Sequence, residues 1–153
     1  MRTFGRYFAN LYNTDVNKIL IHPTDSDIIF ATVQNTGLKV TTDGGVNWSS
    51  PTNDSRSFDV EFKPGDPSVV YASGNGLHKS TDGGKTWVEL KSGLPVGKMG
   101  RIGLAVSPVN SNYVYAILEA EEGKGGFFKS TDKGESWKKQ SDYKTSGNYY
   151  QEI

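Results

Sequence analysis

Several features that mark common classes of protein are missing from this sequence. It has no cysteine, which excludes a disulfide framework. Its 17 basic and 17 acidic residues cancel, and no stretch carries charge mainly of one sign. The basic face typical of nucleic-acid binding is therefore lacking, and we expect no nucleic-acid partner. No apolar run approaches the ~20 residues that cross a bilayer, so we expect no membrane span. Residues 1–6 also lack the apolar stretch of a signal peptide.

The sequence also lacks the apolar stripe at i, i+3, i+4 and i+7 that would predict a long helix. What it has instead is one short phrase in three copies, at residues 41–48, 80–87 and 130–137. Each copy reads hydroxyl, Thr, Asp, any residue, Gly, any residue, polar, Trp, and the three copies contain all three tryptophans. Self-similarity at a period of tens of residues indicates a repeat architecture.

The similarity extends upstream of each phrase. Residues 21–31 align without gaps to residues 62–72 and 106–116, each with a proline followed by an Asx turn and an aromatic-Ala pair. Insertions fall between the aligned segments, chiefly at residues 119–125 in the third copy. The repeat unit is thus a set of short segments joined by loops of variable length.

Each copy divides into four short strands. Enrichment in β-branched and aromatic residues, interrupted by Gly, Pro and Asx, predicts strands. The first strands are expected at residues 18–22, 59–63 and 102–107, the second at 28–33, 69–73 and 113–119, and the third at 37–41, 76–80 and 126–130. The tryptophan then opens a more polar fourth strand, as in residues 87–90. Four antiparallel strands per unit of roughly 40–50 residues is the pattern of a propeller blade.

We therefore predict an all-β fold, a β-propeller segment of about three four-stranded antiparallel blades. The blades are expected at residues 15–50, 57–91 and 100–140. Residues 141–153 are interpreted as the start of a further blade, and residues 1–14 as a lead-in or the remnant of a preceding blade.

The phrase has a mechanical explanation. An Asp side chain accepts hydrogen bonds from the amides that follow it, and Gly permits the positive φ of a tight turn. Tryptophan supplies a large apolar wedge, and we expect all three tryptophans to be buried beneath their turns. We assign structural roles at the turns between third and fourth strands to these residues: Thr41, Asp43, Gly45, Trp48, Ser80, Asp82, Gly84, Thr86, Trp87, Ser130, Asp132, Gly134, Ser136 and Trp137.

These residues resemble the Asp-box, or bacterial neuraminidase repeat (BNR). The wider phrase is most similar to the sortilin-type and xyloglucanase-type Asp-box propellers, and the resemblance covers about residues 15–153. Asn47 stands where the repeat usually has Thr or Ser, and Lys133 interrupts the Gly-Gly pair. The resemblance implies that the boxes lie away from the binding face. It also implies a secreted, periplasmic or lumenal protein.

Catalytic residues are not assigned. A sialidase needs an arginine triad, and besides Arg101 the chain has only Arg2, Arg6 and Arg56. A xyloglucanase-like glycosidase needs two opposed carboxylates on loops at the propeller face. The candidates for such a ligand face are Asp59, Arg101, Glu119, Glu121 and Glu122.

Other small-molecule sites are not expected. The boxes offer one carboxylate followed by glycines, unlike a calcium loop, so we predict no metal site and no cofactor. The two histidines, His22 and His78, are far apart in the sequence and are expected at the surface. Neither a metal pair nor a catalytic triad is implied.

Three functions remain open. The favoured hypothesis is a non-catalytic recognition scaffold that binds a protein, a peptide or a glycan through its loop face. The alternative is part of a secreted glycoside hydrolase, xyloglucanase-like or, less favoured, a sialidase, with catalytic carboxylates mostly outside this segment. A third is a structural role in a larger assembly. Three blades leave two blade faces uncovered, so we expect either the remaining blades of a longer chain, which we favour, or self-association to close the ring.

Overall fold

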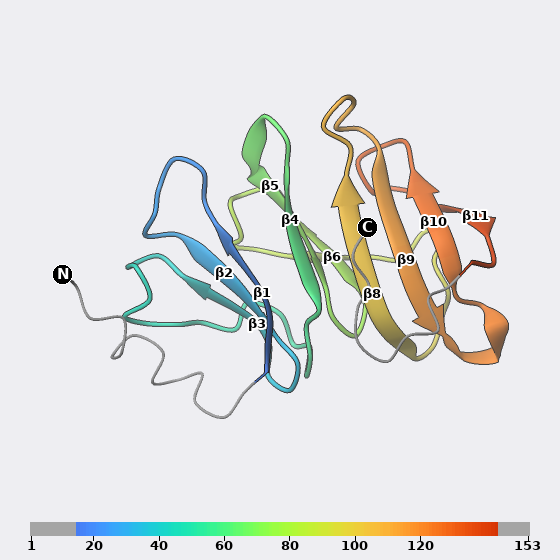
Figure 1. Cartoon of the computed structure of the whole chain (residues 1–153), viewed down its shortest axis with the longest axis horizontal. Helices are drawn as coiled ribbons and strands as arrows, with labels where there is room; N and C mark the ends of the chain where they lie inside the picture. Colours follow the sequence, from blue (N-terminus) through green and yellow to red (C-terminus); the bar gives the residue numbers. More distant parts are fainter. Residues whose placement is uncertain (1–14, 144–153) are drawn as a thin grey trace.

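The computed structural model describes residues 15–143. The predicted lead-in (residues 1–14) and residues 144–153 of the predicted further blade (141–153) lie outside the described residues. The described chain is all-β, with three antiparallel sheets standing side by side (Figure 1). One 3-10 turn, η3 (Glu121–Gly123), interrupts the strands. In the described part of the chain, no helix has the length and apolar character needed to cross a membrane.

Each sheet is one blade, built in sequence order from the inside outwards. Blade 1 contains β1 (Val16–Ile21), β2 (Ile29–Val33) and β3 (Gly37–Thr41). Blade 2 contains β4 (Asp59–Lys63), β5 (Asp66–Ser73), β6 (Leu77–Ser80) and β7 (Val88–Leu90). Blade 3 contains β8 (Met99–Val106), β9 (Val114–Ala120), β10 (Gly126–Ser130) and β11 (Lys138–Ser141). Within each blade, every strand pairs with the next in sequence, as the fold prediction required.

The prediction of four strands is wrong for blade 1. After Trp48 the chain makes only one isolated bridge to β3, between Val40 and Ser49. Pro51 follows two residues later and has no N–H to donate to a neighbouring strand. The fourth segment therefore leaves the sheet after one pair of hydrogen bonds.

Apolar side chains fill the two interfaces between the blades. Phe30, Leu38 and Val40 of blade 1 form one cluster with residues of blade 2, including Val60 and Val70. The second cluster joins blades 2 and 3. Its buried members are Tyr71, Leu77, Leu90, Leu94, Met99, Ile102, Leu104, Val114, Ala116, Leu118, Phe128 and Trp137. The blades thus share their core instead of each having its own.

The alternating strand directions create two unlike ends. The turns from first to second strands and the box turns lie at one end. The connections at residues 34–36, 74–76, 91–98 and 121–125 lie at the other, which we call the loop face. It is the lower end in Figure 1, where η3 is visible.

Candidate functional site

The three boxes form nearly identical turns. In the second box the Ser80 hydroxyl donates to Asp82 Oδ1 at 2.8 Å and accepts from the Gly84 amide at 2.8 Å. Asp82 also accepts from the amide and the hydroxyl of Thr86, at 2.8 and 2.6 Å. Trp87 Nε1 donates to the Gly84 carbonyl at 2.9 Å. The Asp82 carboxylate therefore makes these hydrogen bonds within its own turn, and the hydrogen bonds stabilise that turn.

The first and third boxes repeat this pattern with different side chains. In the first, Asn47 replaces the usual hydroxyl and donates through Nδ2 to Asp43 Oδ2 at 2.7 Å. In the third, Ser136 donates to Asp132 from its amide and its hydroxyl. Lys133, at the interrupted Gly-Gly pair, adopts φ 61°. Both departures from the repeat are therefore accommodated within the turn.

These hydrogen bonds favour the ionised carboxylates. Donation from the Asn47 amide, followed by Thr41 and the Asn47 side chain, lowers the pKa of Asp43 to about 2. The hydroxyl and then the amide of Ser136 lower the pKa of Asp132 to about 2. The Thr86 hydroxyl, with the Thr86 amide, also lowers the pKa of Asp82. These are the shifts expected when several N–H and O–H groups converge on a carboxylate.

We expect acid to loosen all three turns. Because the folded pKa values lie below the ordinary value of 3.8, the stabilisation is fully present above about pH 4 and is lost as pH falls through about 2. The urea midpoint should stay level between about pH 5 and 7 and fall steeply below about pH 4. The Asp82→Asn variant should show a shallower fall, because its amide does not titrate there. An identical acid profile for both proteins would contradict this account.

The tryptophans differ in burial, which corrects the prediction. Trp137 is 6% exposed, whereas Trp48 and Trp87 are only half-buried. Trp137 lies in the large cluster between blades 2 and 3. Trp48 packs against the small cluster formed by Ala31 and Val33. The degree of burial depends on what the neighbouring blade supplies, which the box alone does not encode.

Asp59, a ligand-face candidate, links the three blades instead. It is 8% exposed, and its Oδ2 accepts from the Leu104 amide of β8 at 2.7 Å. Its Oδ1 accepts from the Val60 amide at 2.9 Å and from Lys18 Nζ of β1 at 2.8 Å. Burial opposes the charge on Lys18, but hydrogen bonds to Asp59 and Glu61 raise its pKa. Asp59 therefore connects the innermost strands of the three blades through its hydrogen bonds.

Loss of the Asp59 charge is expected to destabilise the protein. Asp59→Asn keeps an acceptor oxygen but weakens the charge-assisted bonds to Lys18 and Leu104, so we expect a loss of about 1–2 kcal/mol in the free energy of unfolding. Glu61→Gln is the matched control, because Glu61 contacts the same ammonium from a more exposed position and should cost less than about 1 kcal/mol. Urea denaturation of the two variants measures the difference. Equal losses in the free energy of unfolding for the two variants would contradict the role of Asp59 in connecting the blades.

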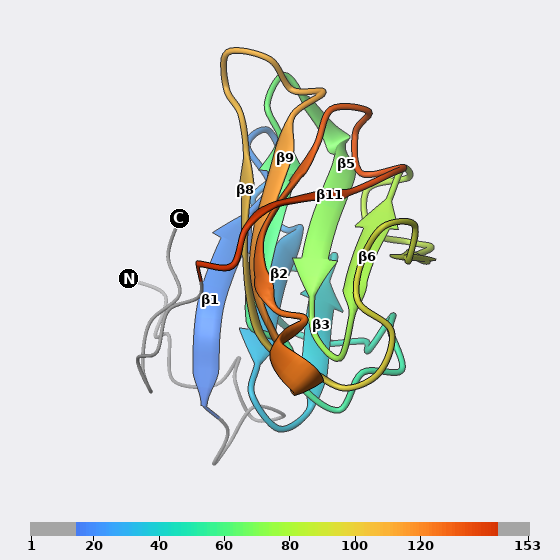
Figure 2. The same cartoon turned by 90° about the vertical axis from the view of Figure 1, so that its right-hand side faces the viewer.

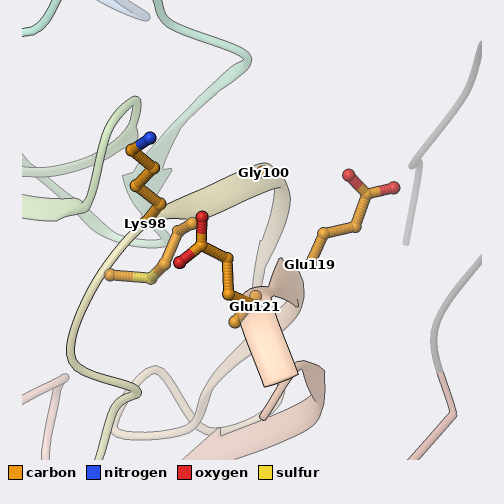
Figure 3. Close-up of a pocket in the computed structure, with 6 residues that line it drawn as sticks. Lys98, Gly100, Glu119 and Glu121 are labelled. Carbon is orange, nitrogen blue, oxygen red and sulfur yellow. The ribbon is translucent and has the colours of Figure 1, made fainter. Parts of the chain in front are cut away.

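A shallow hollow lies on the loop face of blade 3. It measures about 290 Å³ and is lined by Lys98, Met99, Gly100, Glu119, Ala120 and Glu121 (Figure 3). Met99 is 8% exposed, whereas Lys98 and Glu121 are exposed. The hollow therefore has an apolar floor and charged groups of both signs at its rim.

The acidic candidates do not form a catalytic pair. Glu119 covers Gly100 and accepts from the Arg101 amide at 3.2 Å. In Figure 3, Glu119 and Glu121 point to different sides of the strand end. Glu122 pairs with Lys124 at 2.6 Å in solvent. Glycoside hydrolysis needs two carboxyl groups across one cleft, and these side chains do not provide that arrangement.

A polar cluster beside the hollow was not predicted from the sequence. Arg56 donates through Nη2 to the Met99 carbonyl at 2.5 Å and through Nε to Asn75 Oδ1 at 3.2 Å. Nearby, His78 Nε2 lies 2.7 Å from Asp54 Oδ2, with both side chains almost buried. The surface location expected for His78 is therefore wrong. Residues 54–56 are a connection between blades, and no local pattern marks such a segment.

This cluster joins the loop ends of neighbouring blades. A side chain at Gly74 would collide with Asp54 and with the Arg56 carbonyl, and one at Gly37 would collide with the Asp54 carbonyl. Close backbone approach thus requires glycine at both loops. Within residues 15–143, no three His, Asp or Glu side chains are grouped as a metal site would require.

The box geometry agrees with a known repeat. The family model described as BNR/Asp-box repeat matches residues 78–89, which include Ser80, Asp82, Gly84 and Trp87. The chain thus contains an Asp-box repeat at these residues. The comparison with curated protein sequences gives no match.

Solved structures show the same propeller fold. An ancestral GH74 enzyme is 21% identical over 80% of this chain and 18% of its own, with a TM-score of 0.63. YCF48 from Cyanidioschyzon merolae is 21% identical over 82% of this chain and 36% of its own, with a TM-score of 0.56. The Asp-box chain therefore spans about a third or less of either structure. At this identity the likeness establishes the fold alone.

Proposed function

We propose that this Asp-box propeller segment is a non-catalytic recognition scaffold that binds a polypeptide segment on its loop face. The observation that supports the proposal is the hollow beside β8 and β9, with buried Met99 beneath exposed Lys98 and Glu121. At about 290 Å³ it is at the lower limit of small-molecule pockets, but a single apolar side chain of a peptide fits it. Its rim can pair with both signs of charge.

Rigid support makes this surface suitable for binding. The Arg56 guanidinium holds the Met99 carbonyl, and Glu119 holds the Arg101 amide at the start of β8. The walls of the hollow are thereby fixed by blades 2 and 3 before a ligand arrives, which reduces the entropy lost on binding. A peptide with an apolar residue next to a basic one would place them against Met99 and Glu121 respectively.

An array of immobilised 15-residue peptides of varied charge and apolar content tests the proposal. The chain should select peptides with adjacent apolar and basic residues, and Glu121→Lys should weaken that binding at least about tenfold, a change equivalent to about 1.4 kcal/mol. Glu122→Lys is the matched control, because Glu122 is in the same loop but does not line the hollow. Equal binding by both variants would contradict the proposal. Release of sugar from xyloglucan by the chain would favour a glycoside hydrolase instead.

A further inference from the structure

The two interfaces between blades have the same arrangement of an aromatic side chain against a box. Phe30 of β2 packs edge-on against Trp87 of the second box, with ring centroids 6.4 Å apart and an interplanar angle of 76°. Tyr71 of β5 contacts Gly134 of the third box, and its hydroxyl donates to the Lys133 carbonyl at 3.0 Å. The two rings are 0% and 1% exposed. Each blade thus offers an aromatic side chain that the next blade covers with its box.

Tyr115 is the third member of this series. In the gapless alignment of the repeats it occupies the position of Phe30 and Tyr71. It stacks on Phe127 with centroids 5.8 Å apart and an interplanar angle of 8°, and Lys129 Nζ lies 4.2 Å from the Tyr113 ring. We call Tyr113, Tyr115, Phe127 and Lys129 together the Tyr115 face. Figure 2 views blade 3 from this side. Among the described residues, no fourth box covers it.

Blade 1 presents the other half of the same interface. Its Ile19 aligns with Val60 and Leu104, which pack against the preceding blade and are 0% and 3% exposed. Ile19 is 49% exposed, and Val46 in the first box is 57% exposed. The first box and Ile19 therefore form a surface of the kind that covers Phe30 and Tyr71 within the chain.

We propose that the Tyr115 face binds the first box of a second copy of this chain. The Gly44 carbonyl, at the repeat position of Lys133, would accept from the Tyr115 hydroxyl. Lys129 corresponds to Lys79, which pairs with Glu135 of the third box at 2.6 Å. In the proposed contact Lys129 meets Val46, so its alkyl chain packs there without like-charge repulsion.

The contact is head-to-tail, because unlike surfaces meet. Two copies can make it twice, each blade 3 against the other's blade 1. The three described blades of each copy then give six, within the four to eight blades with which propellers usually close. A second copy would thereby bury the exposed Ile19 and Val46 together with the half-buried Tyr115.

Two variants that block opposite halves test the proposal. Light scattering should give the full chain twice its monomer mass of 16.8 kDa, whereas Ile19→Arg and Tyr115→Arg should each be monomeric. Mixing these two variants should give a dimer held by one of the two contacts, because the Ile19→Arg copy keeps an intact Tyr115 face and the Tyr115→Arg copy keeps an intact first box. Val96→Arg is the control, because Val96 is 91% exposed in the connection between blades 2 and 3 and should leave the dimer unchanged.

Circular dichroism spectra establish that each variant is folded, and Lys129→Glu serves as a milder second block if Tyr115→Arg unfolds. A monomeric wild-type chain at the highest soluble concentration would overturn the proposal. A dimer that survives Ile19→Arg would also overturn it, because that result indicates contact between like faces. A dimer that survives both blocks of the Tyr115 face would do the same.

Discussion

Trp137→Ala is expected to lower the free energy of unfolding by about 3–5 kcal/mol, the range for large-to-small changes of aromatic residues in a core. Trp137 is 6% exposed and packs in the cluster between blades 2 and 3. Its Nε1 donates to the Gly134 carbonyl at 3.0 Å, and its amide donates to the Ser92 carbonyl at 2.9 Å. Truncation would leave a cavity where the third box meets its neighbour.

Trp48→Ala is the matched control for this change. Trp48 is half-buried and contacts a much smaller cluster, so its loss should cost less than about 3 kcal/mol, the upper value for full burial of a large apolar side chain. Urea denaturation of both variants gives the comparison. If Trp137→Ala were as stable as the wild type, the interpretation of the third box as part of the shared core would be wrong.

Gly84→Ala is expected to lower the free energy of unfolding by about 2–5 kcal/mol. Gly84 has φ +90°, where an L side chain is strained by ~1–2 kcal/mol. An added Cβ would also lie 2.5 Å from Phe30 Cε1, and overpacking of this kind costs about 1–3 kcal/mol. The ring of Phe30 is fully buried and cannot move aside easily. Gly84 is therefore needed both for the backbone conformation of the turn and for close packing against Phe30 of the preceding blade.

Gly83→Lys separates these two causes. Gly83 has φ +72° and no atom within 4 Å of an added Cβ, and the third box already carries Lys133 at this position with φ 61°. Gly83→Lys should therefore bear only the backbone strain, about 1–2 kcal/mol. Thermal and urea unfolding of the pair measure the difference. Equal losses would show that contact with Phe30 contributes nothing.

The candidate site was only partly predictable from the sequence. The acidic insertion after β9 was located correctly as a loop between strands, and Glu119 and Glu121 line the hollow there. Arg56, however, reaches the Met99 carbonyl across 43 positions. Such a contact depends on how two blades are placed side by side, and neither residue has a neighbour in sequence that indicates it. The structural and ligand-face roles assigned from the boxes and loops stay predictions until variants are measured.

The sequence by itself determined the repeat, the strand order and the box turns, because these depend on hydrogen bonds between residues a few positions apart. Asp82 with Thr86 is one such pair, four positions apart. Tertiary structure alone decided which boxes are deeply buried, why the second glycine faces Phe30, and that Asp59 binds the Leu104 amide 45 positions away. The physical reason is that contacts between blades depend on the distance and angle at which whole sheets stack, and no local spacing of residues specifies either.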